Sequence, residues 1–270
     1  MTIKKTLGII ILTGLWFTSF SQTTEQKTRS GRPDIPGTFA LEIGLNRMTE
    51  KPNNLKYGLW GSRTLNVYYQ YDIRIAKSKF SFHPGIGFGM ERFKLMNYDI
   101  VTVGTDGEQK VTQYLNPTLG YDANGNSVFI PADNYINDDD TLGQIDWSGS
   151  FNVKKSMLVT NFLDIPVEFR FSTNPGDPAR SFKIGIGGRV GYLLNAHTKI
   201  RYKEDGEIKK LKEHESFNLT KVRYGAFFKV YLGNFSFFSY YNVNPLFKSD
   251  KGPAKTEAQT FTVGISLSSF

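Results

Sequence analysis

The chain has 270 residues, of which 39% are hydrophobic and 14% aromatic, and it contains no cysteine. A mean hydropathy of −0.34 excludes a bundle of apolar transmembrane helices, and the lack of cysteine excludes a disulfide framework. The net charge of +8 favours anionic lipid headgroups over nucleic acid as a partner, because the first residues predict export.

Residues 1–21 have the pattern of a secretory signal peptide. Two lysines precede an apolar stretch at 7–20, and the small residue Ser21 fits the position before a cleavage site. The apolar stretch is too short to span a bilayer as a helix. We therefore expect export through the general secretory pathway, followed by a polar periplasmic arm at 22–37.

The strands are predicted by strict alternation, seen best from Leu65 to Ile75, where every second residue is large and apolar. A strand with this two-residue period has one apolar and one polar face. The pattern recurs and predicts eight strands near residues 39–45, 65–75, 80–91, 163–171, 182–194, 222–230, 235–243 and 261–267.

The connections between these strands alternate in length. The short ones lie at 77–79, 174–178 and 233–234, and the long ones at 49–61, 97–155, 204–215 and 248–258. Short periplasmic turns and long extracellular loops are typical of transmembrane β-barrels. We predict an all-β fold, a transmembrane antiparallel up-and-down β-barrel of about eight strands over 38–270. The alternative is a soluble periplasmic β-protein that packs its apolar faces on each other.

If the apolar face contacts lipid, charges of both signs point into the barrel. An eight-stranded barrel is just wide enough for side chains to fill it, so these charges should pair across the lumen. We therefore predict a plugged, non-conducting barrel. The predicted lumen charges are Glu42, Asp72, Arg74, Glu91, Asp164, Glu168, Arg170, Lys183, Arg189, Arg223 and Lys229.

The long insert at 97–155 is the segment most specific to this chain. Turn signals at 106–107 and 124–125 predict two hairpins, which either project past the membrane or join the ring and make ten strands. Its aromatic residues are candidate binding anchors, or they form the core of a folded loop. The candidate anchors are Tyr114, Tyr121, Tyr135 and Trp147.

Nothing in the sequence predicts catalysis. The three histidines, His83, His197 and His214, fall far apart on the expected barrel, and no nucleophile elbow, zinc spacing or phosphate loop is present. The carboxylates at 138–140 do not have EF-hand spacing. No enzyme activity, cofactor or metal is therefore expected.

Three segments resemble the PorT-like outer-membrane β-barrel family of Gram-negative bacteria. They are the LDIPVE sequence at 163–168, GGRVGYLLNA at 187–196, and GISL at 264–267 with the final Phe270. The resemblance implies an outer-membrane barrel folded by the outer-membrane assembly machinery, with Phe270 in the C-terminal assembly signal. Founding members of that family take part in protein export and gliding.

These observations favour a non-enzymatic scaffold or binding module that sits in outer-membrane lipid and engages a surface partner through its extracellular loops. The alternatives are an accessory component of a protein secretion or gliding complex, and a small passive channel. Nucleic acid is not an expected partner.

Overall fold

The computed structural model describes residues 37–53, 55–76, 78–103, 108–132, 152–177, 180–204 and 206–268. The predicted signal peptide, Tyr135, Trp147 and Phe270 lie outside the described residues. The helices η1 (Leu59–Gly61) and η4 (Pro253–Lys255) are 3-10 turns of three residues each. No helix in the described part of the chain is long and apolar enough to cross a membrane.

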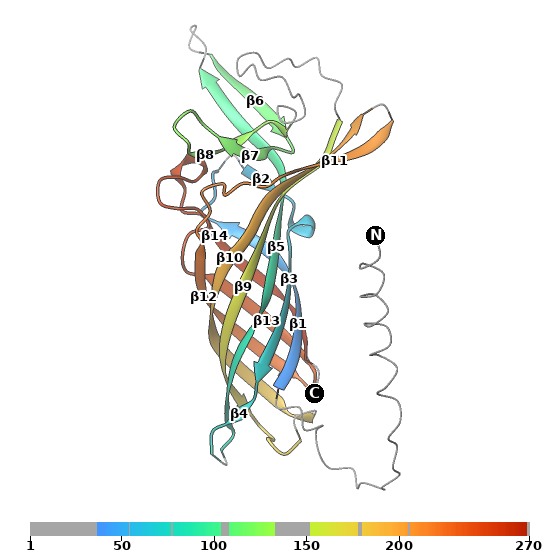
Figure 1. Ribbon diagram of the computed structural model, residues 1–270, viewed down its shortest axis with the longest axis vertical. Coiled ribbons are helices and arrows are strands. Elements are labelled where there is room, and N and C mark those ends of the chain that lie inside the picture. Colours follow the sequence, from blue (N-terminus) through green and yellow to red (C-terminus); the bar gives the residue numbers. More distant parts are fainter. Residues whose placement is uncertain are drawn as a thin grey trace, which may run out of the picture. The chain divides into compact units, whose positions relative to one another are not determined.

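Eight strands form a closed antiparallel ring (Figure 1). The ring closes because the last strand pairs with the first, Ile265 lying opposite Ile43. The predicted eight-stranded up-and-down barrel is thereby confirmed. In sheet order the strands are β1 (Gly37–Thr49), β3 (Arg63–Tyr71), β5 (Phe80–Val103), β9 (Asn152–Ser172), β10 (Phe182–Glu204), β12 (Val222–Leu232), β13 (Phe235–Asn242) and β14 (Gln259–Ser268).

The alternation in the sequence becomes an outer and an inner face. On β1, Leu41 and Ile43 are 37% and 47% exposed, whereas Glu42 between them is 2% exposed. The same holds on β3, where Val67 is exposed and Asn66 and Tyr68 are buried. The barrel therefore has an apolar outer surface and a polar interior, the inverse of a water-soluble protein.

The two ends of the barrel differ, as the loop lengths predict. At one end short turns join the strands, including the two-residue turn between Leu232 and Phe235. There Gly233 has φ of 65°, which a type II′ hairpin requires at its first central position. The two-residue strand β4 (Ile73–Arg74) also lies at this end, and β1 begins and β14 ends there.

At the long-loop end, β5, β9 and β10 continue past the ring and carry further strands (Figure 1). β2 (Leu55–Tyr57) and β6 (Gln109–Leu115) pair with β5, and β11 (Glu207–Glu213) pairs with β10. β7 (Thr118–Tyr121) and β8 (Ser127–Ile130) form a separate two-stranded sheet. The two hairpins predicted in the insert are thus β5–β6 and β7–β8. β6 pairs with the extension of the ring strand β5, and neither β6 nor the β7–β8 sheet adds a strand to the ring.

Candidate functional site

The lumen holds a network of buried charges, and its first half centres on Arg223 of β12. The Arg223 guanidinium donates to both carboxylate oxygens of Asp164, at 3.2 and 2.7 Å, and to Glu91 Oε1 at 2.5 Å. The Tyr68 hydroxyl also donates to Asp164, at 2.8 Å, and Arg189 donates to that hydroxyl. These side chains come from β3, β5, β9, β10 and β12, so the network ties together strands from opposite sides of the ring.

The second half centres on Glu168 of β9. It accepts from Arg170 Nε at 2.9 Å and from the Tyr231 hydroxyl at 2.6 Å. Lys229 Nζ lies 2.7 Å from Glu42 Oε1 and 3.5 Å from Glu168 Oε2, so it links the two carboxylates. Each of these charged groups is at most 5% exposed, and a charge buried to that degree is tolerated only when it is paired.

Little space remains between these side chains. The cavity bounded by Glu42, Arg189 and Lys229 measures about 10 Å³, which is about the room for one water molecule. Gly89 faces the network, where a side chain would collide with Asp164 and Arg223. The interior is therefore filled at this level, as expected for a barrel of eight strands.

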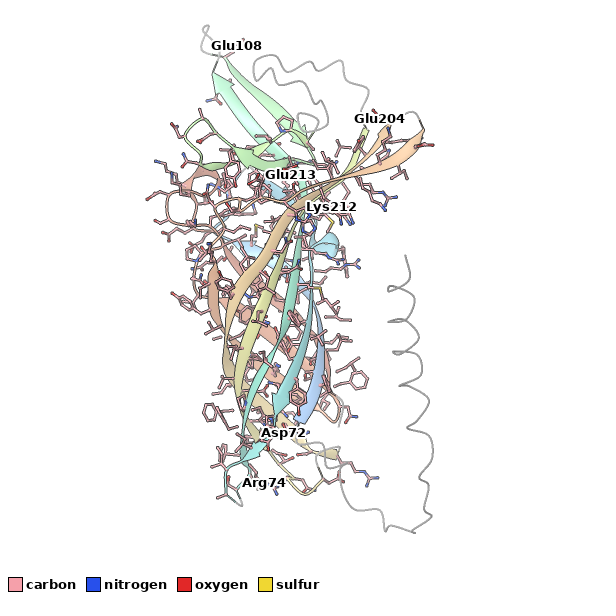
Figure 2. The ribbon with its side chains drawn as sticks, in the orientation of Figure 1. Asp72, Arg74, Glu108, Glu204, Lys212 and Glu213 are labelled. Atoms are coloured by element: carbon pink, nitrogen blue, oxygen red, sulfur yellow. The ribbon has the colours of Figure 1, made fainter. Side chains whose placement is uncertain are left out.

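Most of the charges predicted to face the lumen are brought together there, and one prediction is wrong. The buried members are Glu42, Glu91, Asp164, Glu168, Arg170, Lys183, Arg189, Arg223 and Lys229. Arg74 is exposed, because regular pairing of β3 ends at Tyr71 and β4 continues past the ring (Figure 2). Asp72 is half-buried at the same end.

Asp72 belongs to a hydrogen-bonded relay that the sequence did not reveal. The His83 ring contacts Asp72 Oδ1 through Nδ1 at 2.5 Å and Ser81 Oγ through Nε2 at 2.7 Å. The order of groups is that of a Ser–His–Asp triad, in which a base and its carboxylate activate a hydroxyl. Sequence spacing gave no signal for it, because the turn between β4 and β5 brings Asp72 beside His83.

The order Ser–His–Asp does not by itself make a hydrolase. A hydrolase needs room for the reacting carbonyl about 3 Å from the hydroxyl, with donors for its oxyanion. The lumen cavity just described is not lined by Ser81 or His83. We therefore expect a fluorophosphonate probe to leave the folded protein unlabelled, as read by intact mass. Labelling of the wild type that Ser81→Ala abolishes would contradict this.

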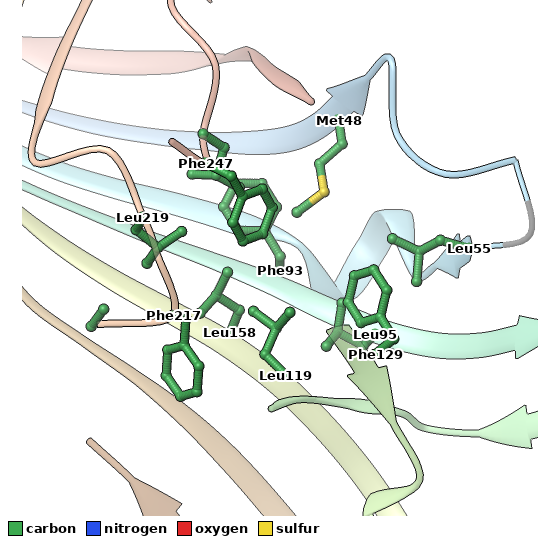
Figure 3. Close-up of a cluster of buried hydrophobic side chains, with 12 residues drawn as sticks. Met48, Leu55, Phe93, Leu95, Leu119, Phe129, Leu158, Phe217, Leu219 and Phe247 are labelled. Carbon is green, nitrogen blue, oxygen red and sulfur yellow. The ribbon is translucent and has the colours of Figure 1, made fainter. Parts of the chain in front are cut away.

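A buried apolar cluster closes the long-loop end, and we call it the cap cluster (Figure 3). On β5 and β9 the inward positions change from charged to apolar, at Phe93 and Leu158, which are 0% and 1% exposed. That change of inward residue type is a signal that sequence reasoning missed. The cluster comprises Met48, Leu55, Phe93, Leu95, Leu119, Phe129, Leu158, Ala196, Phe217, Leu219, Leu246 and Phe247.

The β7–β8 hairpin is fastened to neighbouring loops. The Asn126 backbone N–H donates to the Asp122 carboxylate at 2.7 Å and holds the pKa of that carboxyl below its usual value. Gly125 has φ of 70°, which suits the predicted turn. Asn218 donates to the Gly125 carbonyl at 2.8 Å, and Ser127 N–H donates to the Lys251 carbonyl at 2.9 Å. The β7–β8 hairpin and the two loops that contain Asn218 and Lys251 therefore form one folded unit, which we call the head.

Of the four candidate binding anchors, Tyr121 is the one whose side chain the structure describes. Tyr121 is 39% exposed, but its hydroxyl accepts from Phe217 N–H at 2.7 Å and its ring stacks on Phe217, with centroids 6.1 Å apart. It therefore holds the head together as well as facing solvent. Tyr114 lies on β6 opposite Tyr98, and its side chain, like Tyr135 and Trp147, is outside the described set.

The sequence over residues 20–248 matches the family described as "Outer membrane protein beta-barrel domain". The chain belongs to this family. It is therefore an outer-membrane β-barrel protein, whose long-loop end faces the cell exterior and whose short turns face the periplasm. No curated protein matches the chain.

The solved structures that match the chain include the Ail attachment invasion locus protein of Yersinia pestis. It shows 11% identity and a TM-score of 0.34, with 86% of this chain and 97% of that chain covered. A triple mutant of the Rhodopseudomonas blastica porin shows 10% identity and a TM-score of 0.18, with 86% and 99% covered. The assignment of this outer-membrane barrel rests on the family match and on its own closed ring.

Proposed function

We propose that this outer-membrane barrel is non-enzymatic and non-conducting. It anchors the extracellular head, and the head binds a surface partner. The observation that carries the proposal is the division of the interior into two closed layers. Paired charges fill the membrane level, and the cap cluster fills the level above it. A channel needs an open lumen, whereas a binding module needs a rigid surface held clear of the membrane.

The head suits this role because its shape is fixed by its own contacts. Tyr98 and Phe129 pack with ring centroids 5.2 Å apart. The β7–β8 turn is hydrogen-bonded to Asn218 and Lys251, across sequence separations of 93 and 125 residues. A surface fixed in advance loses little conformational entropy when a partner binds. The exposed tip at Asn124 is therefore a fitting contact point.

Site-specific photo-crosslinking in intact cells tests this proposal. A photoreactive residue replaces Asn124 at the extracellular tip or, as the matched control, Asn234 at the two-residue turn of the opposite end. We expect an adduct of defined mass from position 124 and none from position 234. Adducts only from position 234 would favour an accessory role in a secretion or gliding complex, and steps of conductance in a planar bilayer would favour a channel.

The route to the membrane is part of the same proposal. Removal of residues 1–21 by the secretory pathway and recognition of Phe270 by the assembly machinery are supported by the sequence pattern. The segments at 163–168 and 187–196 favour the PorT-like branch within the family. These two segments pair side by side as β9 and β10, with Ile165 opposite Val190.

A further inference from the structure

Basic residues replace apolar ones on the outer surface where the barrel leaves the membrane. Large apolar residues occupy the outward positions up to Leu65 on β3, Met90 on β5 and Leu194 on β10, and beyond them Met96 on β5 is 38% exposed. The following outward positions form what we call the basic face. Its members are Arg63, Arg92, Lys94, Lys155, Lys199, Arg201, Lys210 and Lys212.

Strand pairing makes these residues one continuous surface across β3, β5, β9, β10 and β11. Arg63 lies opposite Arg92, Arg201 lies opposite both Lys155 and Lys210, and Lys199 lies opposite Lys212. Side chains of directly opposed residues point to the same side of a sheet. Lys94 on β5 lies opposite Met157 on β9, and Met157 lies opposite Lys199 on β10. Lys94 therefore connects the basic residues of β3 and β5 to those of β10 and β11.

Acidic residues of the β10–β11 hairpin are kept on its other side. Glu204 pairs with Glu207, and Glu213 lies opposite Thr198, at positions alternate to the lysines (Figure 2). Lys209 shares that side and forms an ion pair with Glu204. Among the described residues, no acidic side chain forms a salt bridge with a member of the basic face. The hairpin therefore has one side of mixed charge and one side on which the described charged residues are all basic, with Ile208 beside them.

Like charges placed directly opposite each other destabilise a sheet, so this arrangement has a cost in the isolated protein. Partial burial and the charges of Lys94, Arg63, Lys199 and Arg92 lower the pKa of the Lys155 ammonium. An anion over these groups would remove the repulsion.

The basic face adjoins an apolar groove on the lipid side of the barrel. The groove measures about 740 Å³, and its lining includes Leu45, Phe237 and Ile265 together with Trp60 and Arg63. Trp60 is 75% exposed, as is typical of a ring at the membrane–water interface. Arg63 belongs to both the groove and the basic face.

We propose that the basic face binds phosphate groups of outer-leaflet lipid, with an acyl chain of the same lipid lying in the adjoining groove. Guanidinium and ammonium groups form charge-assisted hydrogen bonds with phosphate oxygens. The position just outside the apolar belt is the depth of the headgroups. The bound lipid neutralises the like charges and fixes how deeply the barrel sits and how the β10–β11 hairpin lies on the bilayer.

Native mass spectrometry of the full-length protein, released from detergent with equal amounts of phosphatidic acid and phosphatidylcholine, tests the site. The wild type should retain phosphatidic acid preferentially. The triple variant K94Q/K155Q/K199Q should lower this preference about 100-fold, since each basic residue near an anionic surface contributes about fivefold. The control K248Q/K251Q/K255Q removes the same charge from the loop around η4 and should leave the preference unchanged.

Equal retention of the two lipids by the wild type, or equal losses in the two triple variants, would overturn the proposal. Displacement of phosphatidic acid by inorganic phosphate alone would assign the face to small anions and would also overturn it. The dependence of the wild-type lipid preference on sodium chloride concentration is a further test that needs no variant. Raising its concentration should weaken the wild-type preference, because salt screens exposed charges.

Discussion

Replacing Arg223 with methionine is expected to lower the free energy of unfolding by about 3–5 kcal/mol, the cost of breaking a buried ion pair by removing one partner. The variant leaves Glu91 without its 2.5 Å contact and removes two contacts from Asp164. Both carboxylates remain buried, at 1% and 0% exposure. Urea unfolding of the barrel in phospholipid vesicles, followed by intrinsic fluorescence, measures the effect.

Arg74→Met is the matched control, because it removes the same group from the exposed strand β4. It should change stability by less than about 0.5 kcal/mol, as surface substitutions usually do. Adding Glu91→Gln to the Arg223→Met variant should restore part of the loss, since a neutral amide costs less to bury than a carboxylate. Equal stability of Arg223→Met and wild type would show that the lumen charges are solvated.

Replacing Phe93 with alanine should open the head without opening the barrel. Phe93 is fully buried in the cap cluster, and loss of a buried phenylalanine costs about 3–5 kcal/mol. Because the head opens locally, a cost of about 3 kcal/mol corresponds to roughly 100-fold faster cleavage of its loops by an added protease. Limited proteolysis in detergent micelles, with the fragments identified by mass, measures the rate.

Phe88→Ala controls for the size of the change on the same strand. Phe88 is 55% exposed on the outer face, where lipid or detergent chains fill the space that the ring leaves. In the Phe88→Ala variant, the protease should cleave the loops of the head at the wild-type rate. Identical cleavage of Phe93→Ala and wild type would mean that the cap cluster does not hold the loops, and the proposed rigid head would then be wrong.

Much of the barrel follows from the order of residues alone. The pleat of a strand sends successive side chains to opposite faces, so the alternation from Leu65 onward decides which residues meet lipid and which are enclosed. The position of Gly233 decides a turn, and the alternation of loop lengths decides which end carries the head. Arg74 shows the limit, because alternation does not say where a strand leaves the ring.

Which charges meet was decided by tertiary structure. Arg223 and Glu91 are 132 residues apart, and the closure of the ring and the stagger of its strands bring them together. The cap cluster and the basic face likewise join residues from strands that are distant in sequence. His83 and Asp72 are only 11 residues apart, and the turn between β4 and β5 brings them together. Periodicity along one strand carries no information about its register with another strand, so the sequence determined the two faces of the wall, and only the closed barrel decided their contacts.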